Sequence, residues 1–223
     1  MKIFTAISKG QAAAYTSHLD FQRVLQQAAR RAKLPLAYSQ GFSPHPLFAF
    51  ATALATGYSS DGEWVEMELI EDLSPKDFIK RLNAQLPPGL RAVQAMVAPL
   101  TAKSLASGME AALYGIVLDC NASIAEDAVR AAFAGILADT EILHEKKGKG
   151  GLSMVNIRPQ ILELRLLAVS GSTVFLRAKG VLTAAGGLRP EFLVKTVLER
   201  LQVNGTARVH RERICFSRDS AVF

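Results

Sequence analysis

The stretch EWVEMELIEDLSPKDFIKRLNAQLPPGLRAVQAMVA, residues 63–98, contains a strand, a helix and a second strand in succession. In its first eight residues the side chains of alternate positions face opposite sides, which is the two-residue period of a strand. Ser74 followed by Pro75 is typical of an N-cap with proline at the first helical position. A helix is therefore expected from there to about Gln85, and residues 90–98 supply the next strand.

The residues before this stretch complete the same pattern. Residues 2–8 are expected to form a strand, and Ser17 with Asp20 three positions later resembles a capping box that opens a helix to about Lys33. Residues 47–54 are expected to form the strand that precedes the quoted stretch. The order strand, helix, strand, strand, helix, strand is that of a ferredoxin-like unit.

The second half of the chain repeats this order. The expected strands are 111–119, 152–169, 172–180 and 206–216, and the expected helices are 123–138 and 189–202. The sequence therefore predicts an α+β protein of two tandem ferredoxin-like (βαββαβ) domains. The N-terminal domain covers residues 1–99, the small polar stretch 100–110 is the linker, and the C-terminal domain covers residues 111–223.

Composition agrees with a folded protein. The chain has 223 residues, of which 49% are hydrophobic and 21% charged, so it can bury a sizeable core. Cys120 and Cys215 are its two cysteines, and no close Cys or His spacing of a zinc site or an iron-sulfur cluster is present. We expect buried thiols, no metal, no cofactor bound by this chain, no membrane segment, and a cytoplasmic location.

Positive charge is concentrated near the C-terminus. The net charge is +6 overall, and residues 144–223 carry fourteen Lys or Arg against six acidic residues. Such an excess favours a polyanion such as RNA or DNA, and the C-terminal domain is expected to present a basic surface. The alternative is a solvated basic surface that serves only solubility.

A helix and the loop after it, residues 17–46, hold many residues suited to binding. His18 lies at the expected helix start, where unpaired amides can bind a phosphate beside an imidazole; alternatively, its ring only packs over the helix end. Arg30 and Arg31 lie near the helix end, where they either complement the helix dipole or fork onto a phosphate. The two arginines point about 100° apart, so at most one is expected to share the face of His18.

The loop AYSQGFSPHP, residues 37–46, is expected to contact a ligand. Gly41 permits a left-handed turn, Tyr38 and Phe42 can stack on a base, and His45 is fixed between two prolines. Ser39 belongs to the same candidate site. The alternative makes the two aromatic residues core plugs and leaves His45 in solvent.

In the second half, the candidate phosphate contacts are basic. They are Lys146, Lys147, Lys149, Arg158 and Arg189. The first three lie in a glycine-rich loop that has neither the spacing nor the Ser/Thr of a P-loop, so ATP binding is not supported. A flexible, charged hairpin tip is the alternative interpretation.

The motifs SHLD, the RR that follows, LPLAYSQGFSPHP and residues 63–69 resemble a bacterial family, the radical-SAM-linked domain of unknown function. The similarity is weaker over residues 146–159 and 188–191. Members of that family occur alone or fused to a cobalamin-type radical SAM protein. The resemblance implies a radical SAM partner that supplies an iron-sulfur cluster and S-adenosylmethionine. Where the family often has an acidic residue before an Ile-Arg pair, this chain has Asn156.

Three functions are compatible with these residues. The first is an RNA-binding accessory module that presents ribosomal or transfer RNA to the radical SAM enzyme. The second is a protein-interaction scaffold for that partner. The third is a metal-independent RNA-processing enzyme in which His18 is the general base and His45 or Arg31 stabilises phosphate charge. The third requires these side chains to meet at one phosphate.

Overall fold

The computed structural model of the chain describes residues 1–148 and 151–217. It has the α+β composition that the sequence predicts. The chain divides into two compact units: Met1–Glu110 joined by the residues from Arg213 onward, and Ala111–Glu212. Lys149, one of the predicted phosphate contacts, lies outside the described residues.

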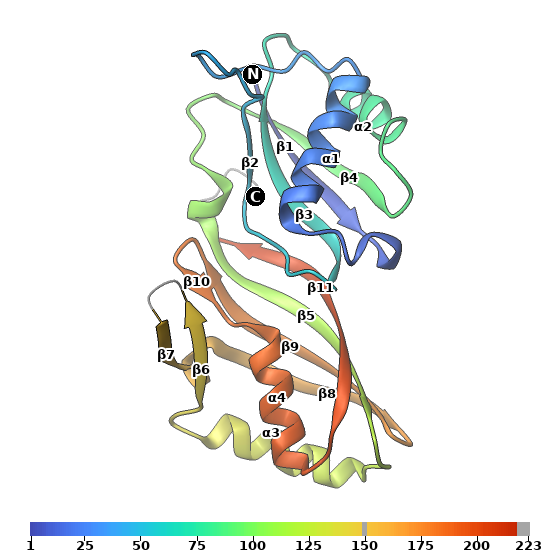
Figure 1. Cartoon of the computed structure of the whole chain (residues 1–223), viewed down its shortest axis with the longest axis vertical. Helices are drawn as coiled ribbons and strands as arrows, with labels where there is room; N and C mark the ends of the chain where they lie inside the picture. The colour runs from blue at the N-terminus through green and yellow to red at the C-terminus, as the bar shows by residue number, and fades with distance from the viewer. Residues whose placement is uncertain (149–150, 218–223) are drawn as a thin grey trace. The chain divides into compact units, whose positions relative to one another are not determined.

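The first unit is an antiparallel sheet with two helices against it (Figure 1). Its elements are β1 (Lys2–Lys9), a short 3-10 helix (Gln11–Ala13), α1 (His18–Arg31), β2 (Phe48–Phe50), β3 (Ser59–Glu68), α2 (Pro75–Asn83), β4 (Leu90–Ala98) and a second 3-10 helix (Leu105–Gly108). Strand β1 pairs with β4 on one side and with β3 on the other, and β2 pairs with β3, all antiparallel. The expected strand 47–54 is thus limited to three residues.

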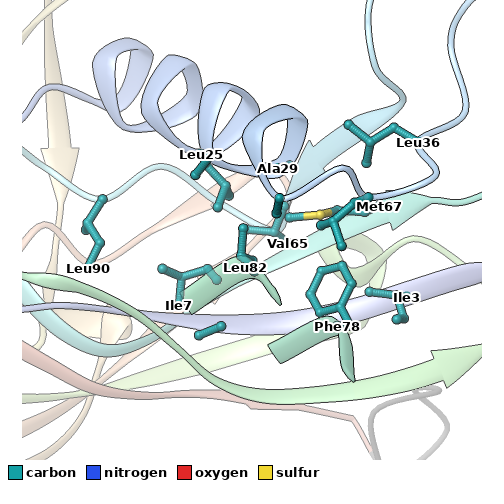
Figure 2. Packing of buried hydrophobic residues seen from close by; sticks show 14 of the residues in the cluster. Ile3, Ile7, Leu25, Ala29, Leu36, Val65, Met67, Phe78, Leu82 and Leu90 are labelled. Atoms are coloured by element: carbon teal, nitrogen blue, oxygen red, sulfur yellow. The ribbon is translucent and has the colours of Figure 1, made fainter. Parts of the chain in front are cut away.

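The core of the first unit lies between the sheet and its two helices. Leu25 and Ala29 point from α1 toward the sheet, and Phe78 lies beside Ile3 (Figure 2). The apolar residues of α1 recur every three or four positions, so one face of the helix is buried. Burying a side chain as large as Leu25, Phe78 or Ile3 stabilises the fold by about 1.5–3 kcal/mol.

Both helices of the first unit begin with a serine cap, as the sequence predicts. The Ser17 hydroxyl accepts a hydrogen bond from the Asp20 backbone N–H at 3.2 Å, and the Ser74 hydroxyl accepts one from Asp77 at 3.1 Å. At the other end of α1, Arg81 of α2 donates to the backbone carbonyls of Ala32 and Lys33. The two helices are therefore fixed to each other by backbone groups as well as by packing.

The second unit is built from the same kinds of element. They are β5 (Met109–Cys120), α3 (Glu126–Ala138), β6 (Leu143–Gly148), β7 (Gly151–Asn156), a 3-10 helix (Arg158–Gln160), β8 (Ile161–Ser170), β9 (Thr173–Thr183), β10 (Gly186–Gly187), α4 (Pro190–Leu201) and β11 (Gly205–Phe216). The strand order is β10, β9, β5, β11, and β8 pairs with β9. Strand β5 starts in the first unit, and β11 returns to it.

The predicted single strand 152–169 is wrong, because the chain is interrupted between β7 and β8. The Asn156 side-chain oxygen accepts hydrogen bonds from the backbone N–H groups of Ile142 and Arg158, both at 3.0 Å. Pro159 follows and has no N–H to give to a sheet. Strand β7 instead forms a separate hairpin with β6, in the stretch for which a hairpin tip was the alternative interpretation.

Within the described part of the chain, no helix is both long enough and apolar enough to cross a membrane.

Candidate nucleic-acid interface

The loop 37–47 is closed by a clamp of three hydrogen bonds between Ser39 and His45. The Ser39 hydroxyl lies 2.8 Å from His45 Nδ1 and accepts the His45 backbone N–H at 3.1 Å, while the Ser39 N–H donates to the His45 carbonyl at 2.9 Å. One step closer to the sheet, Leu47 donates to the Ala37 carbonyl at 2.9 Å. These bonds continue a ladder outward from the sheet, so the tip of the loop is held by its own polar groups.

The tip of this loop presents an aromatic ring to solvent. Gly41 has a φ of 120°, which favours glycine, and Phe42 after it is fully exposed. Tyr38 is 42% exposed, and the guanidinium carbon of Arg30 lies 6.0 Å from the centre of its ring. The structure therefore places Arg30 against Tyr38, next to the Ser39–His45 clamp, and Phe42 lies at the tip of the same loop. We call these residues, with Gly41, the loop platform.

Arg31 does not belong to the loop platform. Its guanidinium donates to the Gln85 carbonyl at 3.1 Å, just after α2. This bond joins the end of α1 to the end of α2, so the fold itself uses Arg31. The 100° step between neighbouring helical positions accounts for the different directions of Arg30 and Arg31.

His18 is the first residue of α1, whereas Arg30 of the loop platform lies in the last turn of that helix. The His18 ring packs edge-on against Phe50, with 5.0 Å between the ring centres. A helix of 14 residues is about 20 Å long, so His18 is separated by that length from Arg31 and from the Tyr38 contact of Arg30. The structure does not bring His18 and His45 to a single phosphate, which the proposed RNA-processing mechanism would need.

His18 instead faces two buried charges that the sequence analysis missed. Lys9, at the end of β1, donates from its ammonium to the carbonyls of Ala14 at 3.0 Å and Thr16 at 2.8 Å. Burial lowers the pKa of Lys9, and the negative charge of Glu63 on β3 partly offsets that effect. The sequence offered a signal, because Lys9 ends one strand and Glu63 lies inside another, at positions where buried apolar residues are usual.

Burial is also the main influence on His18 itself. It lowers the pKa of His18; the carboxylate of Glu63 acts in the opposite direction, and the charge of Lys9 lowers the pKa further. A half-buried imidazole of this kind is predominantly neutral near pH 7. It can then accept one hydrogen bond and donate another, but it offers no positive charge to a phosphate.

In the second unit, the β6–β7 hairpin is joined to α4 through His144. The imidazole stacks on Phe192 with the rings 8° from parallel and 4.9 Å apart, and its Nε2 lies 2.8 Å from the Thr196 hydroxyl. The guanidinium carbon of Arg189 lies 5.7 Å from the centre of the same Phe192 ring. The structure therefore brings Arg189 close to the hairpin that carries Lys146.

Lys147 is exposed and belongs to the opposite face of β6 from His144 and Lys146. Burial lowers the pKa of His144, so that this ring, like His18, is held neutral inside the fold.

Arg158 is engaged by the backbone of the second unit. It donates to the Ile161 carbonyl at 3.0 Å and to the Leu137 carbonyl in the last turn of α3 at 2.7 Å. The side chain therefore satisfies carbonyls at a helix end, as a capping residue does.

Neither thiol nor carboxylate clusters indicate a metal site in the part of the chain that the structure describes. In residues 1–148 and 151–217, no group of three or more His, Cys, Asp or Glu side chains has the geometry to hold an ion. Cys120 is buried as expected, and its burial raises the pKa of the thiol; Cys215 is half-buried.

These features define an α+β protein whose first unit exposes a clamped loop of cationic and aromatic side chains. The chain belongs to a bacterial family described as "Uncharacterized protein conserved in bacteria (DUF2344)", which matches residues 2–190. No curated protein matches the chain.

Several solved structures share its fold at low sequence identity. An archaeal box H/ACA sRNP Nop10–Cbf5 complex matches with a TM-score of 0.53 and 12% identity, over 96% of this chain and 49% of the other. A Cbf5–Nop10–Gar1 complex matches with a TM-score of 0.55 and 12% identity, over 96% and 50%. An H/ACA RNP bound to a substrate RNA containing 2′-deoxyuridine gives a TM-score of 0.51, 12% identity, and coverages of 96% and 49%. The chain thus spans about half the length of these proteins, and the likeness establishes the fold.

Proposed function

We propose that this chain is an RNA-binding accessory module whose loop platform grips single-stranded RNA. The observation that carries the proposal is the fully exposed ring of Phe42 on a loop that Ser39 and His45 hold closed. A ring held in water by a closed loop can stack on a base. Because the loop is already ordered, less conformational entropy is lost on binding. Stacking on aromatic rings and guanidinium planes is how unpaired bases are usually recognised.

Charge supports the same proposal. Arg30 beside Tyr38 places a guanidinium next to the stacking surface, where it can contact a phosphate or a second base. The chain as a whole carries +6, with its basic excess in the C-terminal third. Affinity for RNA should therefore fall steeply as salt is raised.

The architecture that we propose for each unit is ferredoxin-like. In the first unit this rests on the antiparallel order β4, β1, β3, β2 with α1 and α2 in the crossovers. In the second, β11, β5, β9 and β8 take the corresponding places, with the β6–β7 hairpin inserted after α3. Similar folds host many functions, so the fold is compatible with RNA binding without requiring it.

We further propose that the bound RNA is ribosomal or transfer RNA and that this chain presents it to a radical SAM enzyme. The proposal of a radical SAM partner rests on the family resemblance of the Ser17–Pro46 motifs and of residues 63–69. That resemblance implies that the partner would supply the iron-sulfur cluster and S-adenosylmethionine. The chain's own contribution in that arrangement is to bind and position RNA.

Fluorescence anisotropy with labelled single-stranded RNA of random sequence, at low salt, tests the loop platform. The substitutions Phe42→Ala and Tyr38→Ala should each raise the Kd at least about fivefold, since stacking contributes about 1–3 kcal/mol per base. Tyr15→Ala is the matched control, because Tyr15 is 84% exposed and precedes the opposite end of α1. Its Kd should equal that of the parent.

A second pair of variants tests whether RNA binding needs the arginine beside Tyr38 or only a positive charge on the same helix. Arg30→Ser should weaken RNA binding, whereas Arg23→Ser, an exposed arginine of the same helix, should not. If the intact chain shows no salt-sensitive RNA binding, the proposed function is wrong. If the parent chain binds a radical SAM partner but no RNA, and Phe42→Ala abolishes the binding of that partner, the scaffold alternative is established instead.

A further inference from the structure

The sheet of the second unit has one face that its helices do not cover. Along β5, residues Tyr114, Ile116 and Leu118 are buried under the helices, whereas the residues between them are half-buried. Strand β9 alternates in the same way, with Val174, Leu176 and Ala178 buried. The intervening positions of both strands therefore share the open face of the sheet.

Strand β9 places an aromatic ring and two cations in a row on this open face. Phe175, Arg177 and Lys179 follow one another at every second position, and Phe175 is 37% exposed. In the ladder, Phe175 lies opposite Val117 of β5. On the other side, Arg177 lies directly opposite Arg165 of β8.

Carboxylates on the same face hold the arginines in position. Glu212 Oε2 of β11 lies 3.0 Å from Arg177 Nε. This contact crosses β5 at Gly115, where an added Cβ would lie 2.9 Å from the other carboxylate oxygen of Glu212. Glycine at this position therefore leaves room for an ion pair between strands that are not neighbours.

The other two arginines of the face are paired in similar fashion and remain accessible. Arg165 lies 2.8 Å from Glu163 on its own strand and keeps 70% of its side chain exposed. Arg208 of β11 pairs with Asp119 of β5 and is 61% exposed. Their carboxylate partners orient the guanidinium groups without covering them, so an incoming anion can share or replace those partners.

We propose that this open face is a second contact surface for single-stranded RNA, on which a base stacks on Phe175 and the adjoining phosphates contact Arg165 and Arg177. Two arginines placed directly opposite one another in a ladder repel, and a phosphate between them would offset that repulsion. An exposed sheet with an aromatic ring flanked by cations suits unpaired bases rather than a duplex, because stacking needs a free base face.

This inference rests on the proposed RNA-binding function and adds a separate site to it. Photocrosslinking of the full chain to a 4-thiouridine-labelled single-stranded RNA, followed by mass spectrometry of the peptides, tests it directly. The peptide that contains Phe175 should be crosslinked, and a duplex of the same sequence should compete poorly.

Affinity measurements on variants complete the test. Phe175→Ala and Arg165→Ser should each raise the Kd for the single-stranded RNA about fivefold or more. Arg130→Ser is the matched control, because Arg130 is an exposed arginine that also pairs with a glutamate, Glu126, but lies on helix α3. Circular dichroism on each variant verifies that the fold is retained.

The outcomes distinguish the two proposals. If Phe42→Ala weakens binding while Phe175→Ala and Arg165→Ser bind like the parent and no crosslink reaches β9, the open face is not an RNA site and the loop platform stands. If the parent chain binds no RNA at all, both proposals are overturned. A variant of Phe175 that binds RNA normally but loses a protein partner would likewise overturn the RNA assignment of this face.

Discussion

The two units differ in where they keep their charges. Among the residues that the structure describes, the first unit buries Lys2, Lys9, Glu63 and Glu66, whereas the second buries Arg211. Within the described residues of the second unit, most ion pairs lie at the surface, as in Arg165–Glu163. Buried charges are costly to leave unmatched and so specify one structure, whereas surface pairs contribute little and can exchange partners. The first unit thus uses charge to hold its fold, and the second leaves charge available for a ligand.

The largest effect that would test this comparison is expected at Lys9. The substitution Lys9→Met removes the ammonium that bonds to Ala14 and Thr16 and the positive charge that faces Glu63. Breaking a buried interaction of this kind costs about 3–5 kcal/mol of unfolding free energy. Urea denaturation measures it, with the exposed Lys103→Met as control. A loss below about 1 kcal/mol would mean that the buried charges of the first unit do not specify its fold.

The next effect is a pH dependence that the two units should share. Burial lowers the pKa of His18 and of His144 below the ordinary 6.5. Just below that pH the unfolded chain therefore binds more protons than the folded chain. The unfolding free energy is not reduced by these histidines above that pH, and it falls as the pH decreases. Urea denaturation between pH 8 and 5 should show this decline.

The variants His18→Leu and His144→Leu should each make the decline less steep, and the double variant should flatten it most. An unchanged slope in the double variant would show that other groups, such as carboxylates, control the acid sensitivity.

Helix capping gives a smaller difference between the units. Ser17 and Ser74 cap the helices of the first unit, whereas α3 of the second has Ala125 at its N-cap and no side-chain bond there. Replacing either serine by alanine should cost about 1 kcal/mol. Ala125→Ser should stabilise the chain by up to about 1 kcal/mol, as thermal denaturation would show. A destabilised Ala125→Ser variant would contradict the assignment of a free capping position.

The smallest effect is expected at the surface pairs of the second unit. Arg165→Ser and Arg130→Ser should each change the unfolding free energy by less than about 1 kcal/mol, because exposed ion pairs contribute little. The same urea experiment measures both. If Arg165→Ser destabilised the chain as much as Lys9→Met, the open face would be part of the fold and the contrast between the units would fail.

The helices could be predicted from residues close together in the sequence. The site could be predicted only in part, because it depends on pairing between distant strands. Ser17 and the three- and four-residue apolar spacing act within a few residues, so α1 follows from its own sequence. The break at Pro159 also had a local signal, because proline has no N–H to give to a sheet. In contrast, the approach of Lys9 to Glu63 depends on the pairing of β1 with β3, where Ile7 lies opposite Glu63.

The loop platform shows the same division. The aromatic and glycine residues of the loop 37–46 indicated a held shape, but the bond between Ser39 and His45 is made only when the loop closes. The RNA-processing alternative required His18 and His45 to meet at one phosphate, but His18 begins α1, whereas Arg30, which contacts Tyr38 of the loop, lies about 20 Å away in its last turn.

The path of the chain through the units has a consequence for its synthesis. Phe216, near the end of β11, packs edge-on against Trp64 with 6.1 Å between the ring centres, and Ser217 donates to the Gly108 carbonyl at 2.8 Å. Both contacts belong to the first unit, yet Phe216 and Ser217 are synthesised only after all of Ala111–Glu212. At about 5–20 residues per second, roughly 8–30 seconds pass between the synthesis of Trp64 and that of Phe216. During that interval Trp64 lacks the ring that packs against it in the finished chain, so a chaperone would be expected to bind there.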